Sequence, residues 1–173
     1  MATRLKPRDA GSEPPETFSD AELYERPGFL LRRAHQISVS IFLQECEELR
    51  LTPPQHSILF VLHRWPGLDQ TTLARAIGFD RATVGETLGG METRGLLRRA
   101  VSAQDKRRKV LFLTAKGRDV MTRAIAAIHH TSDRLLAPLS AERRELFIEM
   151  LTQITGELND ASRSPVRRPD RAD

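Results

Sequence analysis

Apolar residues recur at helical spacing through most of this sequence, and the pattern begins with a helix predicted from Pro27 to about Leu49. Two neighbouring rows along this helix are mostly apolar, so it is apolar over more than one face. The rows are Leu30, Ala34, Ile37 and Ile41, and Leu31, His35, Ser38 and Phe42. A single small domain has too little surface to bury both rows. This indicates that the helix also packs against a partner.

Two short helices joined by a tight corner are predicted next. Asp69 and Asp80 can each accept a hydrogen bond from the backbone at the start of a helix. Gly78 lies between them and suits the left-handed conformation that a sharp turn requires. The second helix turns three apolar residues inward at i, i+4 and i+7: Val84, Leu88 and Met91.

A two-stranded ribbon follows. Gly95 suits a helix C-cap, and the residue types predict strands over Leu96–Val101 and Lys109–Leu113. The connecting loop, Ser102–Arg108, ends in three consecutive cations. Two helices and a basic ribbon make a winged helix-turn-helix, a shape that docks on duplex DNA.

Two more amphipathic helices are predicted beyond the ribbon. The first follows Thr114 and reaches Pro138, and Ser140 caps the second. The predicted fold class is therefore mainly α with a small β-wing: a winged helix-turn-helix flanked by N- and C-terminal dimerisation helices. The apolar residues of the two helices are Val120, Met121, Ala124, Ile125 and Ile128, then Leu146, Phe147, Met150, Leu151, Ile154 and Leu158.

Positive charge is concentrated in the predicted DNA module. Residues 69–114 hold nine Lys/Arg and five Asp/Glu, a difference of +4 that equals the net charge of the whole chain. The other segments nearly cancel. This distribution is typical of phosphate contact.

Four motifs stand in a distinctive order and spacing: Leu51 to Gln55 before a helix ending near Trp65, Leu73-Ala74 with Asp80, Glu92 to Leu97, and the wing pattern Asp105, Arg107, Leu113, Thr114. Together they resemble the MarR family of bacterial transcriptional regulators over roughly Pro27 to Leu158. One departure is that Glu86, Gly89 and Gly90 stand where such regulators often carry polar or basic residues.

The resemblance implies a homodimer that binds a palindromic operator in double-stranded DNA, represses transcription and is released by a small effector. Two recognition helices related by a two-fold axis enter successive major grooves about 34 Å apart. Several relatives respond to phenolic or hydroxynicotinate-type acids, so a small aromatic carboxylate is the expected effector.

Nine residues are candidates for DNA contact, with Asp105 placed to hold the Arg107 guanidinium in one orientation. The alternative is that Arg98 and similar cations only solvate the helix end and first strand. Glu86 either accepts from cytosine or repels phosphate. The candidates are Gln70, Thr71, Arg81, Thr83, Glu86, Arg98, Lys106, Arg107 and Arg108.

Candidate effector-binding residues lie on two helices. The helix that follows the capping box Thr52–Gln55 carries apolar and cationic groups that suit an aromatic acid. The alternative is that the histidines belong to the core and the arginines to the surface. The candidates are His56, Phe60 and Arg64 on this helix, and Arg32, His35 and Ser38 on the first.

Other functions have weaker support in the sequence. Redox sensing through Cys46 is an alternative, although three nearby glutamates disfavour its thiolate. A winged-helix protein-interaction module without DNA binding would need an acidic or apolar wing. His129-His130 lacks the further ligands of a metal site, and no catalytic motif is present, so neither an enzyme nor a cofactor is expected.

The predicted organisation has five parts. They are a disordered arm (1–26), a dimerisation helix (27–51), the DNA-binding domain (52–114), dimerisation helices (115–160) and a disordered basic tail (161–173). The N-terminus lacks the apolar core of a signal peptide, and no apolar run reaches the roughly 18 residues of a membrane span. A cytoplasmic protein is therefore expected.

Overall fold

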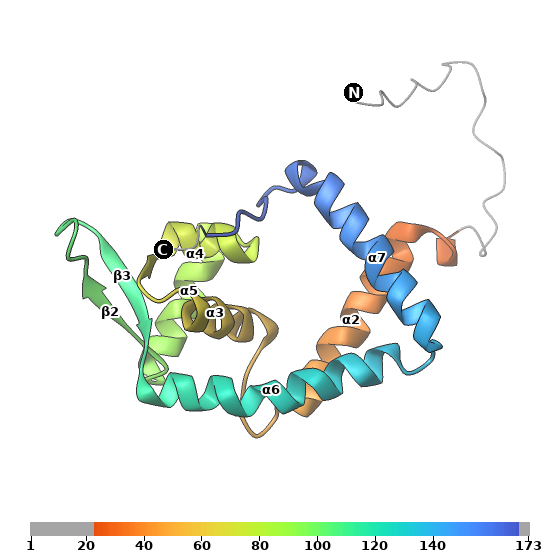
Figure 1. Cartoon of the computed structure of the whole chain (residues 1–173), viewed down its shortest axis with the longest axis horizontal. Coiled ribbons are helices and arrows are strands. Elements are labelled where there is room, and N and C mark those ends of the chain that lie inside the picture. Colours follow the sequence, from red (N-terminus) through yellow and green to blue (C-terminus); the bar gives the residue numbers. More distant parts are fainter. Residues whose placement is uncertain (1–22, 170–173) are drawn as a thin grey trace, which may run out of the picture. The chain divides into compact units, whose positions relative to one another are not determined.

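The computed structural model describes residues 23–169, which fall into two compact units, one ending at Gln36 and the other beginning at Ile37 (Figure 1). Helix α2 (Pro27–Glu45) contributes residues to both. Of the predicted N-terminal arm, residues 1–22 lie outside the described residues. Just before α2, Tyr24 packs edge-on against Phe29, with ring centroids 5.1 Å apart.

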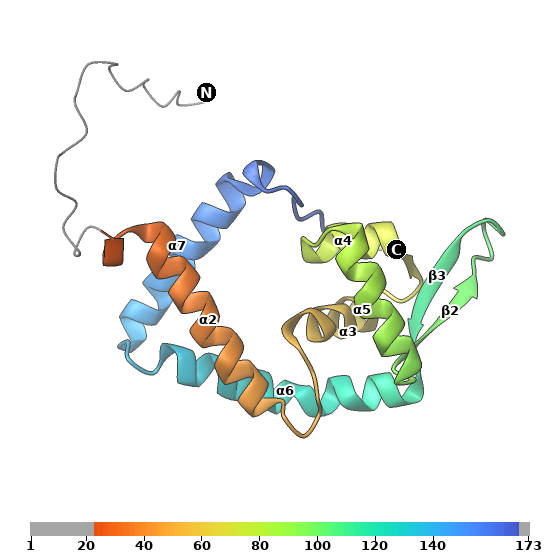
Figure 2. The ribbon, with the colours of Figure 1, turned by 180° about the vertical axis from the view of Figure 1, so that it is seen from behind.

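The second unit contains the predicted helix-turn-helix (Figure 2). Both predicted caps are confirmed, because Asp69 Oδ1 accepts from the Thr72 N–H and Asp80 Oδ1 from the Thr83 N–H, each at 2.9 Å. Gly78 has a φ of 68°, as the turn requires. The helices are α3 (Pro53–Arg64), α4 (Gln70–Ile77) and α5 (Arg81–Thr93).

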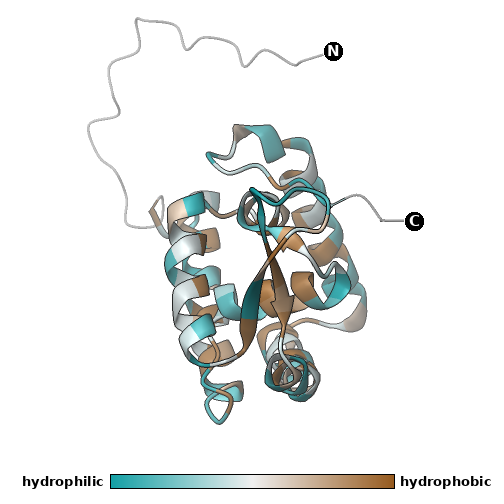
Figure 3. Cartoon of the chain, turned by 90° about the vertical axis from the view of Figure 1, so that its left-hand side faces the viewer, coloured by the Kyte–Doolittle hydropathy of each residue, from teal (hydrophilic) through white to brown (hydrophobic). Residues whose placement is uncertain are grey.

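The wing is part of a three-stranded antiparallel sheet of order β1-β3-β2. Its predicted hairpin is confirmed, with a register that runs from Leu97 opposite Leu113 to Val101 opposite Lys109. In Figure 3 the strands contain hydrophobic segments, whereas the loop between them is hydrophilic. Strand β1 was not predicted, because two residues are too short to show alternation. The strands are β1 (Leu68–Asp69), β2 (Leu97–Val101) and β3 (Lys109–Leu113).

Helix α5 ends in a turn that joins it to the wing. Gly95 has a φ of 69°, and the Leu96 N–H donates to the Met91 carbonyl at 2.9 Å, which closes the helix end. Helix α6 (Ala115–Leu136) then starts against this turn. A Cβ on Gly117 would overlap the Leu96 carbonyl oxygen, so only glycine allows this approach.

The core of the second unit forms around α3, which packs against α4, α5, α6 and β3. The predicted inward row of α5 is confirmed, because Val84, Leu88 and Met91 are each at most 1 % exposed. Each fully buried side chain of this size contributes about 1.5–3 kcal/mol relative to exposure. Other fully buried side chains are Leu51, Ile58, Leu59, Leu62, Leu73, Leu96, Leu97 and Leu111.

Helix α7 (Ala141–Glu157) begins after Ser140 as predicted, yet none of its side chains is buried. Helix α6 buries one side, including Val120, Met121 and Ala124, and leaves Ile125 exposed. Within residues 23–169, no other element buries the apolar side chains of α7. Those that are exposed are Leu146, Ile148, Met150 and Ile154, and Leu158, just beyond the helix, is exposed too.

The C-terminal segment differs from the prediction of disorder over 161–173. A 3₁₀ turn, η1 (Asn159–Ala161), leads into an extended segment that is described up to Pro169, and residues 170–173 lie outside the described part. The Arg167 N–H donates to the Arg75 carbonyl of α4 at 2.8 Å. Composition alone suggested a solvated tail, but these contacts with α4 are non-local.

Candidate functional site

A cationic groove lies between the start of α4, the start of α5 and the wing. It has a volume of about 530 Å³ and is lined by six cationic side chains and the carboxylate of Asp69. Thr71 and Leu111 also contribute to its walls. The cations are Arg75, Arg81, Arg99, Arg107, Arg108 and Lys109.

The carboxylate that holds a wing guanidinium differs from the predicted one. Asp105 Oδ1 accepts from the backbone N–H of Arg107 at 2.9 Å and so shapes the loop rather than the guanidinium. The guanidinium that a carboxylate holds is that of Arg108, which pairs with Asp69. The prediction erred because Asp69 is 39 residues from Arg108, and only the β1–β3 pairing brings them together.

Arg98, another candidate for DNA contact, is not among the residues that line the groove. Its guanidinium stacks over the Phe112 ring, 4.8 Å from the centroid, on the opposite side of the ribbon from Arg99. Arg99 lines the groove and pairs with Glu92 at 3.1 Å. Successive strand residues point to opposite faces, so only one of these two arginines can face the groove.

Several predicted DNA contacts also fix the geometry of the helix starts. Gln70 Nε2 donates to the Arg81 carbonyl at 3.1 Å and joins α4 to α5. The Thr83 hydroxyl donates to Asp80 Oδ2 at 2.6 Å, and this bond lowers the pKa of the Asp80 carboxyl. Gln70, Thr71 and Arg81 line the groove, and their contact with DNA stays a prediction.

The outward face of α5 carries few long side chains. Glu86 is exposed, and a Cβ on Gly89 or Gly90 would meet open space. Gly85 is the exception, because its Cβ would lie 3.0 Å from Gln70 Nε2.

Lys106 is exposed in the wing loop but does not line the groove.

Among the cations that line the groove, sequence reasoning chose Arg98 instead of Arg99, and it missed Arg75 and Lys109. Arg75 follows Thr71 by four residues on α4, and this helical spacing could have placed it on the same face. Lys109 directly follows the predicted cationic run and begins β3. Both therefore had local signals.

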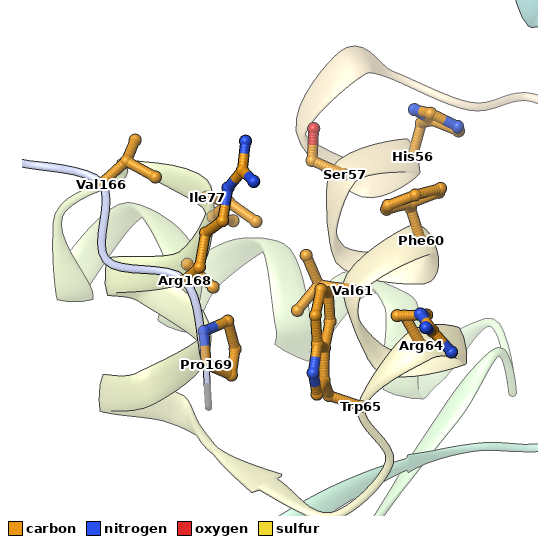
Figure 4. Close-up of a pocket in the computed structure, with 11 residues that line it drawn as sticks. His56, Ser57, Phe60, Val61, Arg64, Trp65, Ile77, Val166, Arg168 and Pro169 are labelled. Atoms are coloured by element: carbon orange, nitrogen blue, oxygen red, sulfur yellow. The ribbon is translucent and has the colours of Figure 1, made fainter. Parts of the chain in front are cut away.

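A second site is an open pocket of about 700 Å³ beside α3 (Figure 4). Three predicted effector residues, His56, Phe60 and Arg64, line it. Burial lowers the pKa of His56, which favours the neutral imidazole. The other lining residues are Ser57, Val61, Trp65, Ala76, Ile77, Val166, Arg168 and Pro169.

The three candidates on α2 are not among the lining residues of this pocket. Ser38 is half-buried. Arg32 and His35 belong to the first unit, where Arg32 stacks on Phe29 at 4.9 Å and donates to Gln36 at 3.1 Å. Their part in effector binding stays a prediction.

Cys46 lies in the core with no exposed surface. Burial and, secondarily, Glu45 raise the pKa of its thiol, which opposes the thiolate that redox sensing requires. Over residues 23–169, no three His, Cys, Asp or Glu side chains are grouped to hold a metal ion.

None of the described helices is both long and apolar enough to cross a membrane.

Comparison with known proteins places this architecture in one family. Residues 51–108 match the MarR family. The chain is 38 % identical over 104 residues to the transcriptional regulator HosA of Escherichia coli O157:H7, a match that covers 60 % of this chain and 77 % of HosA.

Two solved structures share the fold and are similar in sequence. The repressor CouR, bound to a 23-mer DNA duplex, has a TM-score of 0.74 and 34 % identity, covering 80 % of this chain and 99 % of CouR. The regulator PcaV of Streptomyces coelicolor, in complex with its natural ligand, has a TM-score of 0.73 and 32 % identity, covering 80 % and 98 %. The chain belongs to the MarR family of winged-helix transcriptional regulators.

Proposed function

We propose that this protein is a homodimeric repressor that binds duplex DNA and is released by a small aromatic acid. The observation that carries the proposal is the cationic groove, in which six cations from α4, α5 and the wing converge around one carboxylate. Such a surface supplies the phosphate contacts that dominate affinity for DNA. CouR, which shares this fold, has been solved on a DNA duplex.

Dimerisation would account for the bare apolar face of α7. Exposed apolar side chains that follow one another along a helix mark an interaction surface. Leu146, Met150 and Ile154 are each about half exposed, at 48 %, 51 % and 48 %. A second copy of the chain is the occupant that a two-fold DNA site requires, because each half-site needs its own recognition helix.

The pocket beside α3 is the proposed effector site. Its apolar side chains can hold an aromatic ring, and Arg64 or Arg168 can pair with a carboxylate. CouR has also been solved with p-coumaroyl-CoA, and PcaV with its natural ligand. A coupling of about 1–3 kcal/mol between pocket and groove would change DNA affinity roughly 5- to 150-fold.

The test of DNA binding is titration of a labelled duplex of about 30 base pairs, long enough for two half-sites one helical turn apart. Affinity is expected to fall steeply as salt rises, because bound Lys and Arg displace counterions. Flat or absent binding would support the protein-interaction module instead. If the protein binds DNA, selection from random duplexes is expected to yield an inverted repeat, which would define the operator.

Dimerisation is tested with Ile154→Asp, which places a charge on the exposed face of α7. Sedimentation is expected to show a dimer for the wild type and a monomer for the variant, with weaker binding of the selected duplex. A matched control is Thr152→Asp, an exposed polar position on the same helix. Equal sedimentation of all three proteins would contradict the interface.

Effector release is tested by adding salicylate, p-coumarate or 6-hydroxynicotinate to the protein–duplex complex. At least one acid is expected to stabilise the free protein to heat and to release the duplex. His56→Ala is expected to retain DNA binding and to need more acid for release. If that variant were released from DNA at the same acid concentration as the wild type, His56 would have no role in effector binding.

A further inference from the structure

The C-terminal segment folds back and is held by its own side chains. Asn159 Oδ1 accepts from the Val166 N–H at 2.9 Å, and Asn159 Nδ2 donates to the Val166 carbonyl at 3.2 Å. Asp160 pairs with Arg167 at 2.6 Å. These contacts close a loop between η1 and the extended residues that follow it, so the segment has a defined shape despite its polar composition.

This segment is docked on the last turn of α4. The Arg75 carbonyl is one of the last four of that helix, which have no partner within the helix, and the Arg167 N–H supplies one at 2.8 Å. Val166 lies over Gly78, where a Cβ would be 2.8 Å from Val166 Cγ2. The helix end thus has both a hydrogen-bond acceptor and a surface for the segment.

Docking places the segment opposite α3 across the pocket (Figure 4). Arg168 and Pro169 lie on one side, and Ser57, Val61 and Trp65 on the other; Ile77 of α4 also lines the pocket. His56, Phe60 and Arg64 occupy the neighbouring row of α3, which Figure 4 shows pointing away from the segment. Arg168 is therefore the cation on the segment side of the pocket.

We propose that residues 164–169 form a wall of the effector pocket and that Arg168 binds the carboxylate of an aromatic acid there. This inference rests on the proposed effector function and adds a residue to it. The ring would lie among Val61, Trp65 and Ile77, and the guanidinium would form a bidentate pair with the carboxylate.

The same contacts connect the pocket with the groove. Arg75 offers its carbonyl to the segment, while its side chain lines the cationic groove. Ala76 and Ile77, the next two residues, line the pocket. An acid bound to Arg168 would therefore be connected to the end of α4 through the hydrogen bond between Arg167 and Arg75.

The wall is tested without ligand, through the chain's single tryptophan, Trp65. The double variant N159A/V166D removes the two hydrogen bonds of the Asn159 side chain and places a carboxylate where Val166 packs over Gly78. Both changes should release the segment from α4. Quenching of Trp65 fluorescence by acrylamide is expected to increase at unchanged circular dichroism. Unchanged quenching would overturn the wall. Arg163→Ala, an exposed position on the same segment, is the matched control.

The role of Arg168 is tested by calorimetry with salicylate, p-coumarate and 6-hydroxynicotinate, each beside its neutral amide. Arg168→Ala is expected to weaken binding of the acid roughly tenfold or more, the loss typical of a charged hydrogen bond, and to leave amide binding unchanged. Arg163→Ala should bind both like the wild type.

Two outcomes separate this inference from the proposed function. If the wild type binds an acid and Arg168→Ala binds it equally well, the role of Arg168 is overturned while the effector function stands. If the wild type binds none of the acids but still binds duplex DNA, the effector half of the function fails, and the role of Arg168 fails with it.

Discussion

Arg108 of the wing forms an ion pair with Asp69, the residue that also caps α4. One carboxylate oxygen accepts from the Thr72 N–H and the other from the Arg108 guanidinium. The start of α4 and the wing are therefore connected through a single side chain. Both elements line the cationic groove, so this ion pair helps to set the spacing of the cations there.

Replacing Asp69 separates its two roles. Asp69→Asn retains a good N-cap and loses the ion pair, so it should destabilise the fold by less than about 1 kcal/mol, as for exposed pairs. Asp69→Ala also loses the cap and should cost about 1 kcal/mol more. Urea unfolding measures both, and equal stability of the two variants would refute the capping role.

Two arginines of the wing, Arg107 in the loop and Arg98 in β2, offer a matched pair for DNA binding. Arg107→Ala should weaken binding to operator and random duplexes alike and reduce the salt slope by about one. Arg98→Ala removes the same charge from the opposite side of the ribbon, over Phe112, and should leave the slope nearly unchanged. Anisotropy titrations at several salt concentrations measure both slopes. Equal slopes for the two variants would contradict the assigned faces.

Two glycines on helices should respond oppositely to alanine. Gly117→Ala should destabilise the fold by about 3 kcal/mol, because the new Cβ overlaps the Leu96 carbonyl and the backbone must shift. Gly90→Ala fills open space within α5 and should stabilise the fold by about 0.5–1 kcal/mol. Thermal unfolding of both proteins checks the signs, and a neutral Gly117→Ala would contradict the close approach.

Arg94 should matter for stability rather than for DNA. Its guanidinium donates to the carbonyls of Leu49 and Arg50, at 2.9 and 2.8 Å, and to Gln55 Oε1 at 3.1 Å. Arg94→Ala is expected to cost about 2–3 kcal/mol, since charged hydrogen bonds are lost together. Arg94→Lys should recover only part of the lost stability, because an ammonium group cannot reproduce the planar geometry of the guanidinium donors. Denaturant midpoints provide the measurement, and full recovery by lysine would refute the geometry.

His56 should make stability depend on pH. Burial lowers its pKa in the folded protein below the ordinary value of 6.5, so the unfolded chain binds more protons just below that pH. The contribution of neutral His56 to the free energy of unfolding is therefore complete above pH 6.5. It is lost as the pH falls toward the folded pKa, by at most about 1.4 kcal/mol per pH unit. His56→Gln should lose less over this range. Parallel pH profiles of unfolding would contradict the buried neutral imidazole.

The sequence alone determined the local elements. Capping side chains and left-handed glycines act within a few residues, so Asp69, Asp80, Gly78 and Gly95 could be assigned without a structure. Helical spacing identified the buried row of α5 in the same way. The cationic loop also follows from composition, because a short turn between strands must be exposed.

The tertiary structure decided which of these groups meet. The pairing of Asp69 with Arg108 depends on β1, and the wall formed by Arg168 depends on a segment that returns to α4. Strand register selected Arg99 over Arg98 for the groove. Such contacts join residues far apart in the chain, and no local spacing encodes them. Packing around α3 brings them together, because the burial of its apolar faces fixes where the other elements lie.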